Sequence, residues 1–209
     1  MYKLAIFDFD STLMDGETLE FIAETIGIRE EIAEITAKAM NGKIDFFESL
    51  IERVSFLKGI PEAKVNEICR NLPFINGAKE TITELKKAGI KVICFSGGFK
   101  NALVPAKEYL GLDGEFSNIL HAKNEMLTGM VGGEMMFSDS KGHMLLKLQN
   151  ILKIPPEQTI VVGDGANDIS MFYHARERVA FCAKDILKAK ASIIIDEKNL
   201  TKILNKINL

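Results

Sequence analysis

The sequence predicts an α/β protein built on a doubly wound parallel sheet, with a helical-bundle cap domain inserted after the first strand. Two observations support this prediction. From residue 78 onward, short apolar runs typical of fully buried strands alternate with helical patterns, and such βαβ alternation indicates a parallel sheet covered by helices on both faces. Residues 17–72 show only helical periodicity, so they interrupt the sheet instead of extending it.

The first strand and the inserted helices follow from the spacing of apolar residues. Residues 4–7 form an uninterrupted apolar run, as in a strand buried on both faces. Three later groups repeat at helical spacing, and glycine-containing breaks divide the segment into about four helices. The groups are Leu19, Ile22, Ala23 and Ile26; Phe47, Leu50, Ile51 and Val54; and Val65, Ile68, Cys69 and Leu72. We therefore expect a catalytic core of residues 1–14 and 76–209 and a cap of residues 15–75.

The remaining elements are expected to complete the core. Strands are predicted at residues 90–95, 159–163, 178–182 and 192–195. Helices are predicted at residues 78–87, directly after Gly97-Gly98, and at residues 142–152, 166–175 and 198–206. Residues 126–137 contain three glycines, which indicates a hairpin or an irregular excursion. Because the insert follows the first strand, we expect it to cover the carboxyl edge of the sheet.

The composition limits the classes of partner. The 209 residues are 47% hydrophobic and 26% charged, with a formal net charge of −3, as in an ordinary globular protein. No basic stripe is present, so we expect no nucleic-acid partner. The apolar runs are too short to cross a bilayer, so we expect no membrane partner. We expect a cytoplasmic location, because a signal-peptide pattern is absent and the three cysteines lie far apart, as free thiols do.

Acidic residues follow two of the predicted strands, at the edge where open α/β sheets bind ligands. Asp8 and Asp10 are two residues apart, so their side chains point to the same side of an extended chain. A glycine-rich turn after residues 159–162 brings Asp164 and Asp168 to the same edge. Asp8, Asp10 and Asp164 together offer the oxygen ligands that suit Mg²⁺, which is the expected cofactor.

A serine–glycine turn and a lysine complete the parts that phosphoryl transfer needs. Ser96, Gly97 and Gly98 come between a strand and a helix, where a hydroxyl and backbone amides hold an anion well. We expect Asp8 to attack phosphorus and to form an aspartyl-phosphate. Asp10 is the expected general acid and base, which protonates the leaving alkoxide and then activates water. The expected phosphoryl contacts are the Phe9 and Asp10 amides, Ser96, Gly97, Lys141 and Asn167; Thr12, Gly98 and Asp168 are expected to support the site.

These segments resemble the four motifs of the haloacid dehalogenase superfamily of aspartyl phosphatases. The matching residues are Asp8-Phe9-Asp10-Ser11-Thr12, Ser96, Lys141 and Gly163-Asp164-Gly165-x-Asn167-Asp168. Four motifs in this order are far more specific than any one of them, and they extend over the whole chain. The resemblance implies a Rossmann-like core, and the helical insert resembles the C1-type cap of the superfamily.

Within the superfamily, the chain is similar to the members that hydrolyse O-phospho-L-serine to serine and phosphate. This resemblance implies the last step of serine biosynthesis, with a small-molecule substrate. It also implies that Glu17 faces the substrate amino group, that Arg53 binds its carboxylate, and that Met40 and Phe46 form an apolar wall that excludes water. Glutamate complements an ammonium, and arginine pairs with a carboxylate in a planar, bidentate way.

Two other functions stay open at this point. One is a phosphotransferase, or a phosphatase that acts on another small phosphorylated metabolite. The other is a catalytically silent regulator that binds a phosphorylated ligand, although a binder needs neither a nucleophile nor a general acid. The sequence predicts no particular oligomeric state.

Overall fold

The computed structural model describes residues 1–207 of the chain. Within these residues, seven strands form the central sheet. The strands are β1 (Leu4–Phe7), β2 (Lys91–Phe99), β3 (Gly114–Lys123), β4 (Met126–Gly133), β5 (Thr159–Gly163), β6 (Glu177–Phe181) and β7 (Ile193–Ile195). Their order in the sheet is β4-β3-β2-β1-β5-β6-β7. All neighbours are parallel except β3 and β4, which form an antiparallel hairpin. The predicted doubly wound sheet is therefore confirmed, with one antiparallel edge strand.

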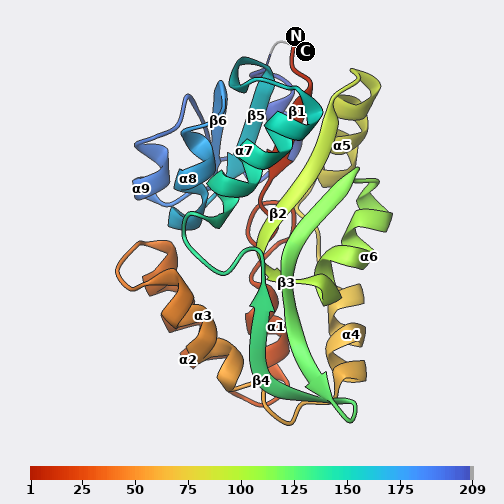
Figure 1. The fold of residues 1–209 in the computed structure, drawn as a ribbon, viewed down its shortest axis with the longest axis vertical. Coiled ribbons are helices and arrows are strands. Elements are labelled where there is room, and N and C mark those ends of the chain that lie inside the picture. Colours follow the sequence, from red (N-terminus) through yellow and green to blue (C-terminus); the bar gives the residue numbers. More distant parts are fainter. Residues whose placement is uncertain (208–209) are drawn as a thin grey trace.

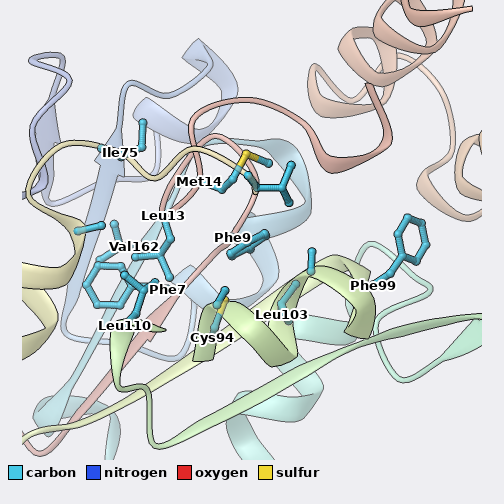
Figure 2. Packing of buried hydrophobic residues seen from close by; sticks show 14 of the residues in the cluster. Phe7, Phe9, Leu13, Met14, Ile75, Cys94, Phe99, Leu103, Leu110 and Val162 are labelled. Carbon is cyan, nitrogen blue, oxygen red and sulfur yellow. The ribbon is translucent and has the colours of Figure 1, made fainter. Parts of the chain in front are cut away.

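Helices cover both faces of this sheet because side chains alternate between the faces along each strand. One face packs on α5 (Ala78–Lys87) and α6 (Lys100–Leu110), and the other packs on α7 (Ser140–Leu152), α8 (Ile169–Phe172) and α9 (Asp185–Lys188). Phe7 belongs to the first cluster and Ile6 to the second. Figure 2 shows the first cluster, in which Phe7 lies among Cys94 and Val162 of the neighbouring strands and Leu110 of α6.

Four inserted helices lie beyond the carboxyl ends of the central strands, in the lower half of Figure 1. They are α1 (Thr18–Glu24), α2 (Arg29–Met40), α3 (Phe46–Ser55) and α4 (Glu62–Arg70), as the apolar spacing predicts. The β3–β4 hairpin reaches down to them. The Gly59 amide donates to the Leu127 carbonyl (2.8 Å), and the Leu127 amide donates to the Ile60 carbonyl (2.9 Å). The turn between α3 and α4 is thus joined to the sheet by main-chain hydrogen bonds.

Several predicted elements were wrong in extent or were missed. Strand β3 and helix α9 were not predicted. A hairpin or an irregular excursion was expected at residues 126–137, but the hairpin pairs residues 114–123 with residues 126–133, so only its second strand lies in the expected segment. The helix predicted directly after Gly97-Gly98 begins only at Lys100, because β2 continues through Phe99. The helices predicted at 166–175 and 198–206 are shorter than expected. They are the 3-10 turn η2 (Ala166–Asp168) followed by α8, and the 3-10 turn η3 (Leu200–Ile203); a further turn, η1 (Pro156–Gln158), precedes β5.

None of the helices in the described part of the chain combines the length and the apolar character that crossing a membrane requires.

Candidate active site

The register of three central strands brings the predicted motifs to one edge. Phe7 of β1 lies opposite Cys94 of β2 and Val162 of β5. The residues that follow, Asp8 and Asp164 among them, therefore leave the sheet side by side. The Asp8 amide donates to the Val162 carbonyl (2.9 Å), which ties this position to β5.

Lys141, in the first turn of α7, lies between two buried carboxylates. Its Nζ is 2.6 Å from Oδ1 of Asp8 and 2.6 Å from Oδ1 of Asp168. Burial alone lowers the pKa of Lys141, but the charges of Asp168 and Asp8 outweigh it, so the pKa is raised overall. The lysine is therefore a permanent cation at the centre of the site.

The nucleophile predicted from the sequence has one oxygen held by the protein. Oδ1 of Asp8 accepts hydrogen bonds from the Phe9 amide (2.7 Å) and from Lys141. Burial, and then the charge of Asp168, raises the pKa of Asp8 to about 7, against the opposing effect of Lys141. The other oxygen, Oδ2, accepts no hydrogen bond from the described residues, which leaves it free to attack.

Asp168 shapes the turn after β5. Its Oδ2 accepts from the amides of Asp164 (3.0 Å) and Gly165 (3.1 Å). A Cβ at position 163 would collide with the Asp168 carboxylate, so a glycine is required there. The carboxylate thus satisfies the backbone amides at the start of the 3-10 turn of residues 166–168.

Asp8, Asp164 and Asp168 form the metal-binding candidate of the described residues. One carboxylate oxygen of each lies within 4.8 Å of those of the other two. Burial and the charge of Asp8 raise the pKa of Asp164 well above its usual range. A divalent cation would relieve this repulsion, and a set of oxygen donors suits a hard cation. The predicted set of Asp8, Asp10 and Asp164 shares Asp8 and Asp164 with this group and stays a prediction. Both oxygens of Asp168 already accept hydrogen bonds, one from Lys141 and the other from the Asp164 and Gly165 amides.

Asp10 is turned toward the first inserted helix. Its Oδ1 accepts from the Thr18 amide (2.7 Å) and the Thr18 hydroxyl (2.5 Å), and the Ser96 hydroxyl lies 3.4 Å from Oδ2. Burial raises the pKa of Asp10, although both Thr18 bonds lower it. A carboxyl with a raised pKa beside the nucleophile is suited to general acid–base work. The sequence pointed to Asp10 but not to Thr18, because no local pattern brings residue 18 to residue 10.

The serine–glycine turn approaches both the acid and the inserted helices. The Ser96 hydroxyl accepts from the Gly98 amide (2.8 Å). A Cβ on Gly97 would lie 2.6 Å from Cζ of Phe46, and one on Gly98 would lie 2.9 Å from Oδ2 of Asp10. A side chain at either position would displace Phe46 or Asp10, so the two glycines let both residues approach the turn closely. The expected help from a helix N-terminus does not apply to these two amides, since α6 begins at Lys100.

A pocket between the sheet edge and the inserted helices brings together most of the predicted residues. Its lining consists of Asp8, Asp10, Glu17, Thr18, Leu19, Met40, Phe46, Leu50, Arg53, Gly97, Gly98, Phe99, Asp164 and Asn167. Lys141 contacts Asp8, and Ser96 contacts Asp10. The sequence did not identify Thr18, Leu19, Leu50 or Phe99 as site residues.

Arg53 and Glu17 line the same pocket. The Arg53 guanidinium donates from Nε to the Ser49 carbonyl (3.0 Å) and from Nη1 to the Thr36 hydroxyl (2.9 Å). Burial lowers its pKa, opposed by the charges of Glu17 and Asp10. The Ser11 hydroxyl donates to Glu17 (2.7 Å), while burial, and then the charge of Asp10, raises the pKa of Glu17 to about 8. Neither residue forms an ion pair with another described residue.

Asn167, a predicted phosphoryl contact, and Thr12, a predicted supporting residue, have buried polar atoms without a partner. Oδ1 of Asn167 accepts no hydrogen bond within residues 1–207, and Oγ1 of Thr12 neither accepts nor donates one. Buried polar atoms normally find a partner. Asn167 lines the pocket, so a bound ligand can satisfy it, whereas the structure shows no partner that explains the predicted supporting role of Thr12.

The corner between α2 and α3 meets the core through side chains. A Cβ on Gly165 would lie 2.9 Å from Sδ of Met40, so the methionine rests on the turn after β5. Next to it, Phe47 of α3 stacks on Phe137 of the core, with ring centroids 4.9 Å apart and an interplanar angle of 12°. These contacts join the inserted helices to the core.

The chain is similar to known proteins over nearly its whole length. A phosphoserine phosphatase of Wolinella succinogenes is 59% identical over 97% of this chain and 98% of its own. A phosphoserine phosphatase of Methanocaldococcus jannaschii is 49% identical over 98% of this chain and 97% of its own. A solved structure described as a phospho-aspartyl intermediate analogue of phosphoserine phosphatase is 48% identical, with a TM-score of 0.96 over 99% of both chains. A substrate-bound phosphoserine phosphatase complex has the same identity and TM-score over 100% of this chain and 99% of its own.

The family comparison agrees with the geometry. The family model described as haloacid dehalogenase-like hydrolase matches residues 2–176, which include all four motifs and the inserted helices. The structure brings those motifs together around Asp8. The chain belongs to the haloacid dehalogenase-like hydrolases.

Proposed function

We propose that this protein is a Mg²⁺-dependent phosphatase that hydrolyses O-phospho-L-serine through an aspartyl-phosphate on Asp8. One observation carries the proposal: a single pocket is lined by the buried nucleophile Asp8, which contacts Lys141, and by Arg53 and Glu17, which have no ion-pair partner among the described residues. Asp8 and Lys141 suit a phosphoryl group, and Arg53 and Glu17 suit the two charges of an amino acid. Relatives named phosphoserine phosphatase, with up to 59% identity, support this substrate.

Asp8 attacks phosphorus, and the residues around it hold the phosphoryl group. Oδ2 of Asp8 is the attacking atom, because Oδ1 is held by the Phe9 amide and Lys141. The proposed contacts of the phosphoryl oxygens are Lys141, Ser96, Asn167 and the amides of Phe9, Asp10 and Gly97. Asp8, Asp10 and Asp164 would hold Mg²⁺, and two of them, Asp8 and Asp164, belong to the buried acidic group. The ion would neutralise phosphoryl charge.

Asp10 moves the protons of both half-reactions. In its protonated form, which the raised pKa favours, it gives a proton to the departing serine oxygen. As a carboxylate it then takes a proton from the water that hydrolyses the aspartyl-phosphate. Thr18 holds one Asp10 oxygen through both steps, so the other oxygen is the one that exchanges the proton.

Arg53 and Glu17 recognise the carboxylate and the ammonium of the substrate. Arg53 is a buried cation without a carboxylate partner among the described residues, and a substrate carboxylate supplies one. The raised pKa of Glu17 means that the empty pocket favours its neutral form, and a substrate ammonium would restore the ionised form. Met40 and Phe46 lie in the same lining and are the proposed apolar wall that excludes water.

Residues 15–75 are proposed to act as a C1-type cap that closes over bound substrate, because Arg53 and Glu17 come from the insert whereas Asp8 comes from the core. The proposed substrate is a small molecule. A cytoplasmic location stays a prediction.

Steady-state turnover with three substrates tests the proposal. Phosphoethanolamine keeps the ammonium of phosphoserine but lacks its carboxylate, and p-nitrophenyl phosphate lacks both. We expect phosphoserine to be preferred, and we expect Arg53→Ala to lower its kcat/KM by roughly 10- to 1000-fold while phosphoethanolamine changes little. Equal losses on both substrates would mean that Arg53 supports the cap fold and that phosphoserine is not the preferred substrate.

The nucleophile is tested in the same assay. Asp8→Asn should lower turnover of every substrate by about 10⁴-fold or more, because an amide is a poor nucleophile. The exposed Asp139 is the matched control, and Asp139→Asn should leave turnover unchanged. Appreciable activity in Asp8→Asn would refute the aspartyl-phosphate route. Adding homoserine as an acceptor would reveal a phosphotransferase through a new phosphorylated product.

A further inference from the structure

We infer that Thr36, on helix α2, determines substrate specificity by orienting the Arg53 guanidinium toward the substrate carboxylate. The inference rests on the proposed function, because it concerns how that carboxylate is recognised. Thr36 does not line the pocket. It is therefore a positioning residue that acts through Arg53.

The contact joins two inserted helices inside the cap. The Thr36 hydroxyl accepts a hydrogen bond from Nη1 of Arg53 at 2.9 Å, and the two residues are 17 positions apart. Thr36 is 3% exposed and Arg53 is 4% exposed, so water does not compete for this bond. In a buried setting, a hydrogen bond to a charged group stabilises more than a neutral one.

Two anchors hold the guanidinium in one plane. The Ser49 carbonyl, one turn earlier on α3, accepts from Nε of Arg53 at 3.0 Å. That bond ties the side chain to its own helix, but one bond at Nε does not set the direction of the outer nitrogens. The bond from Nη1 to the Thr36 hydroxyl of α2 sets that direction. Arginine has five N–H donors, so three of them remain for a planar, bidentate contact with a carboxylate.

The chemistry of the anchor matters as much as its position. A hydroxyl is neutral, so it orients the guanidinium without neutralising its charge. An acidic residue at position 36 would form an ion pair with Arg53 and compete with the substrate. No carboxylate among the described residues forms an ion pair with Arg53, whose charge is therefore available to the ligand.

Three variants of one position separate orientation from packing. Thr36→Val keeps the shape of the side chain and removes the hydroxyl, whereas Thr36→Ser keeps the hydroxyl. Thr36→Ala removes the hydroxyl in a second way, in case valine disturbs the cap. Thr81→Val is the matched control, since Thr81 is also a buried helical threonine, on α5, and its hydroxyl has no partner in the described structure.

The assay compares kcat/KM for phosphoserine and phosphoethanolamine. We expect Thr36→Val and Thr36→Ala to lower the phosphoserine value about 10-fold, mainly through KM, and to change the phosphoethanolamine value less than about 2-fold. Thr36→Ser should stay near the unsubstituted protein on both substrates, and Thr81→Val should change neither. In an Arg53→Ala background, Thr36→Val should have no additional effect.

The outcomes distinguish this inference from the proposed function. If Arg53→Ala discriminates between the two substrates but Thr36→Val and Thr36→Ala do not, the positioning role is refuted and the proposed function stands. If Thr36→Val lowers both substrates equally, or still lowers activity when Arg53 is absent, Thr36 supports the cap fold instead. If Arg53→Ala itself fails to discriminate, the proposed substrate fails, and the role of Thr36 with it.

Discussion

Replacing Lys141 with methionine should destabilise the metal-free protein strongly, because it removes the cation between two buried carboxylates. The ammonium is 2.6 Å from both Asp8 and Asp168, and the three residues are between 0% and 4% exposed. Removing one partner of a buried ion pair destabilises by about 3–5 kcal/mol, since the remaining charge is left uncompensated. Methionine keeps most of the apolar stem, so lost packing adds little.

Thermal unfolding followed by circular dichroism in a chelating buffer measures this effect. For a chain of this length, each kcal/mol shifts the melting temperature by about 2–4 °C, so the expected decrease is roughly 6–20 °C. Lys147→Met is the matched control, because Lys147 is exposed on the same helix, and its expected change is below about 0.5 kcal/mol. Adding Asp168→Asn to Lys141→Met should recover part of the loss by removing one of the two carboxylates.

The pH dependence decides whether charge causes the loss. At low pH, Asp8 can take up a proton instead of remaining an unpaired anion, so Lys141→Met should be less destabilising at pH 5.5 than at pH 8. A melting temperature within about 2 °C of that of the unsubstituted protein at pH 8 would refute the ion-pair argument. An equal loss at both pH values would assign the effect to packing.

Three further predictions concern the same pocket. Burial raises the pKa of Asp8 to about 7, above the value of about 3.9 in an unfolded chain. The native metal-free protein therefore binds the extra proton, and its melting temperature should fall as the pH rises from 5 to 7. Mg²⁺ should restore the melting temperature at pH 8, and a flat pH profile in chelator would contradict this prediction. Gly97→Ala should raise the KM for phosphoserine about 10-fold or more, because the new Cβ would lie 2.6 Å from Cζ of Phe46. Adding Phe46→Leu to the same protein should relieve part of the defect. An unchanged KM in Gly97→Ala would show that the contact relaxes freely. The chain has no tryptophan, so Phe137→Trp introduces a single tryptophan that stacks on Phe47. Its fluorescence emission should change when inorganic phosphate or phosphoserine binds. If the same change persists when Phe47→Ala is added, the emission does not report the contact with Phe47.

Much of the core and its chemistry was predictable because it depends on local sequence. Apolar runs identified β1, β2 and β5, since a strand buried on both faces needs little else. Asp8, Asp10 and Asp164 lie within a few residues of those strands, so the parallel register alone brings them to one edge. The roles expected for Glu17 and Arg53 came from family resemblance, and spacing alone would have left both as ordinary helix residues.

The tertiary structure decided which side chains meet across the fold. Strand β3 was missed because it buries a polar residue: the amide group of Asn118 donates to the carbonyls of Gly97 and Met135, far away in the chain. The Asp10 carboxylate is held by Thr18, eight residues along the chain, which no local pattern predicts. The Thr36–Arg53 bond joins two helices whose apolar spacing is visible in the sequence but whose mutual rotation is not. Spacing along a chain sets the face on which a residue lies, whereas the packing of many distant residues at once sets what that face touches.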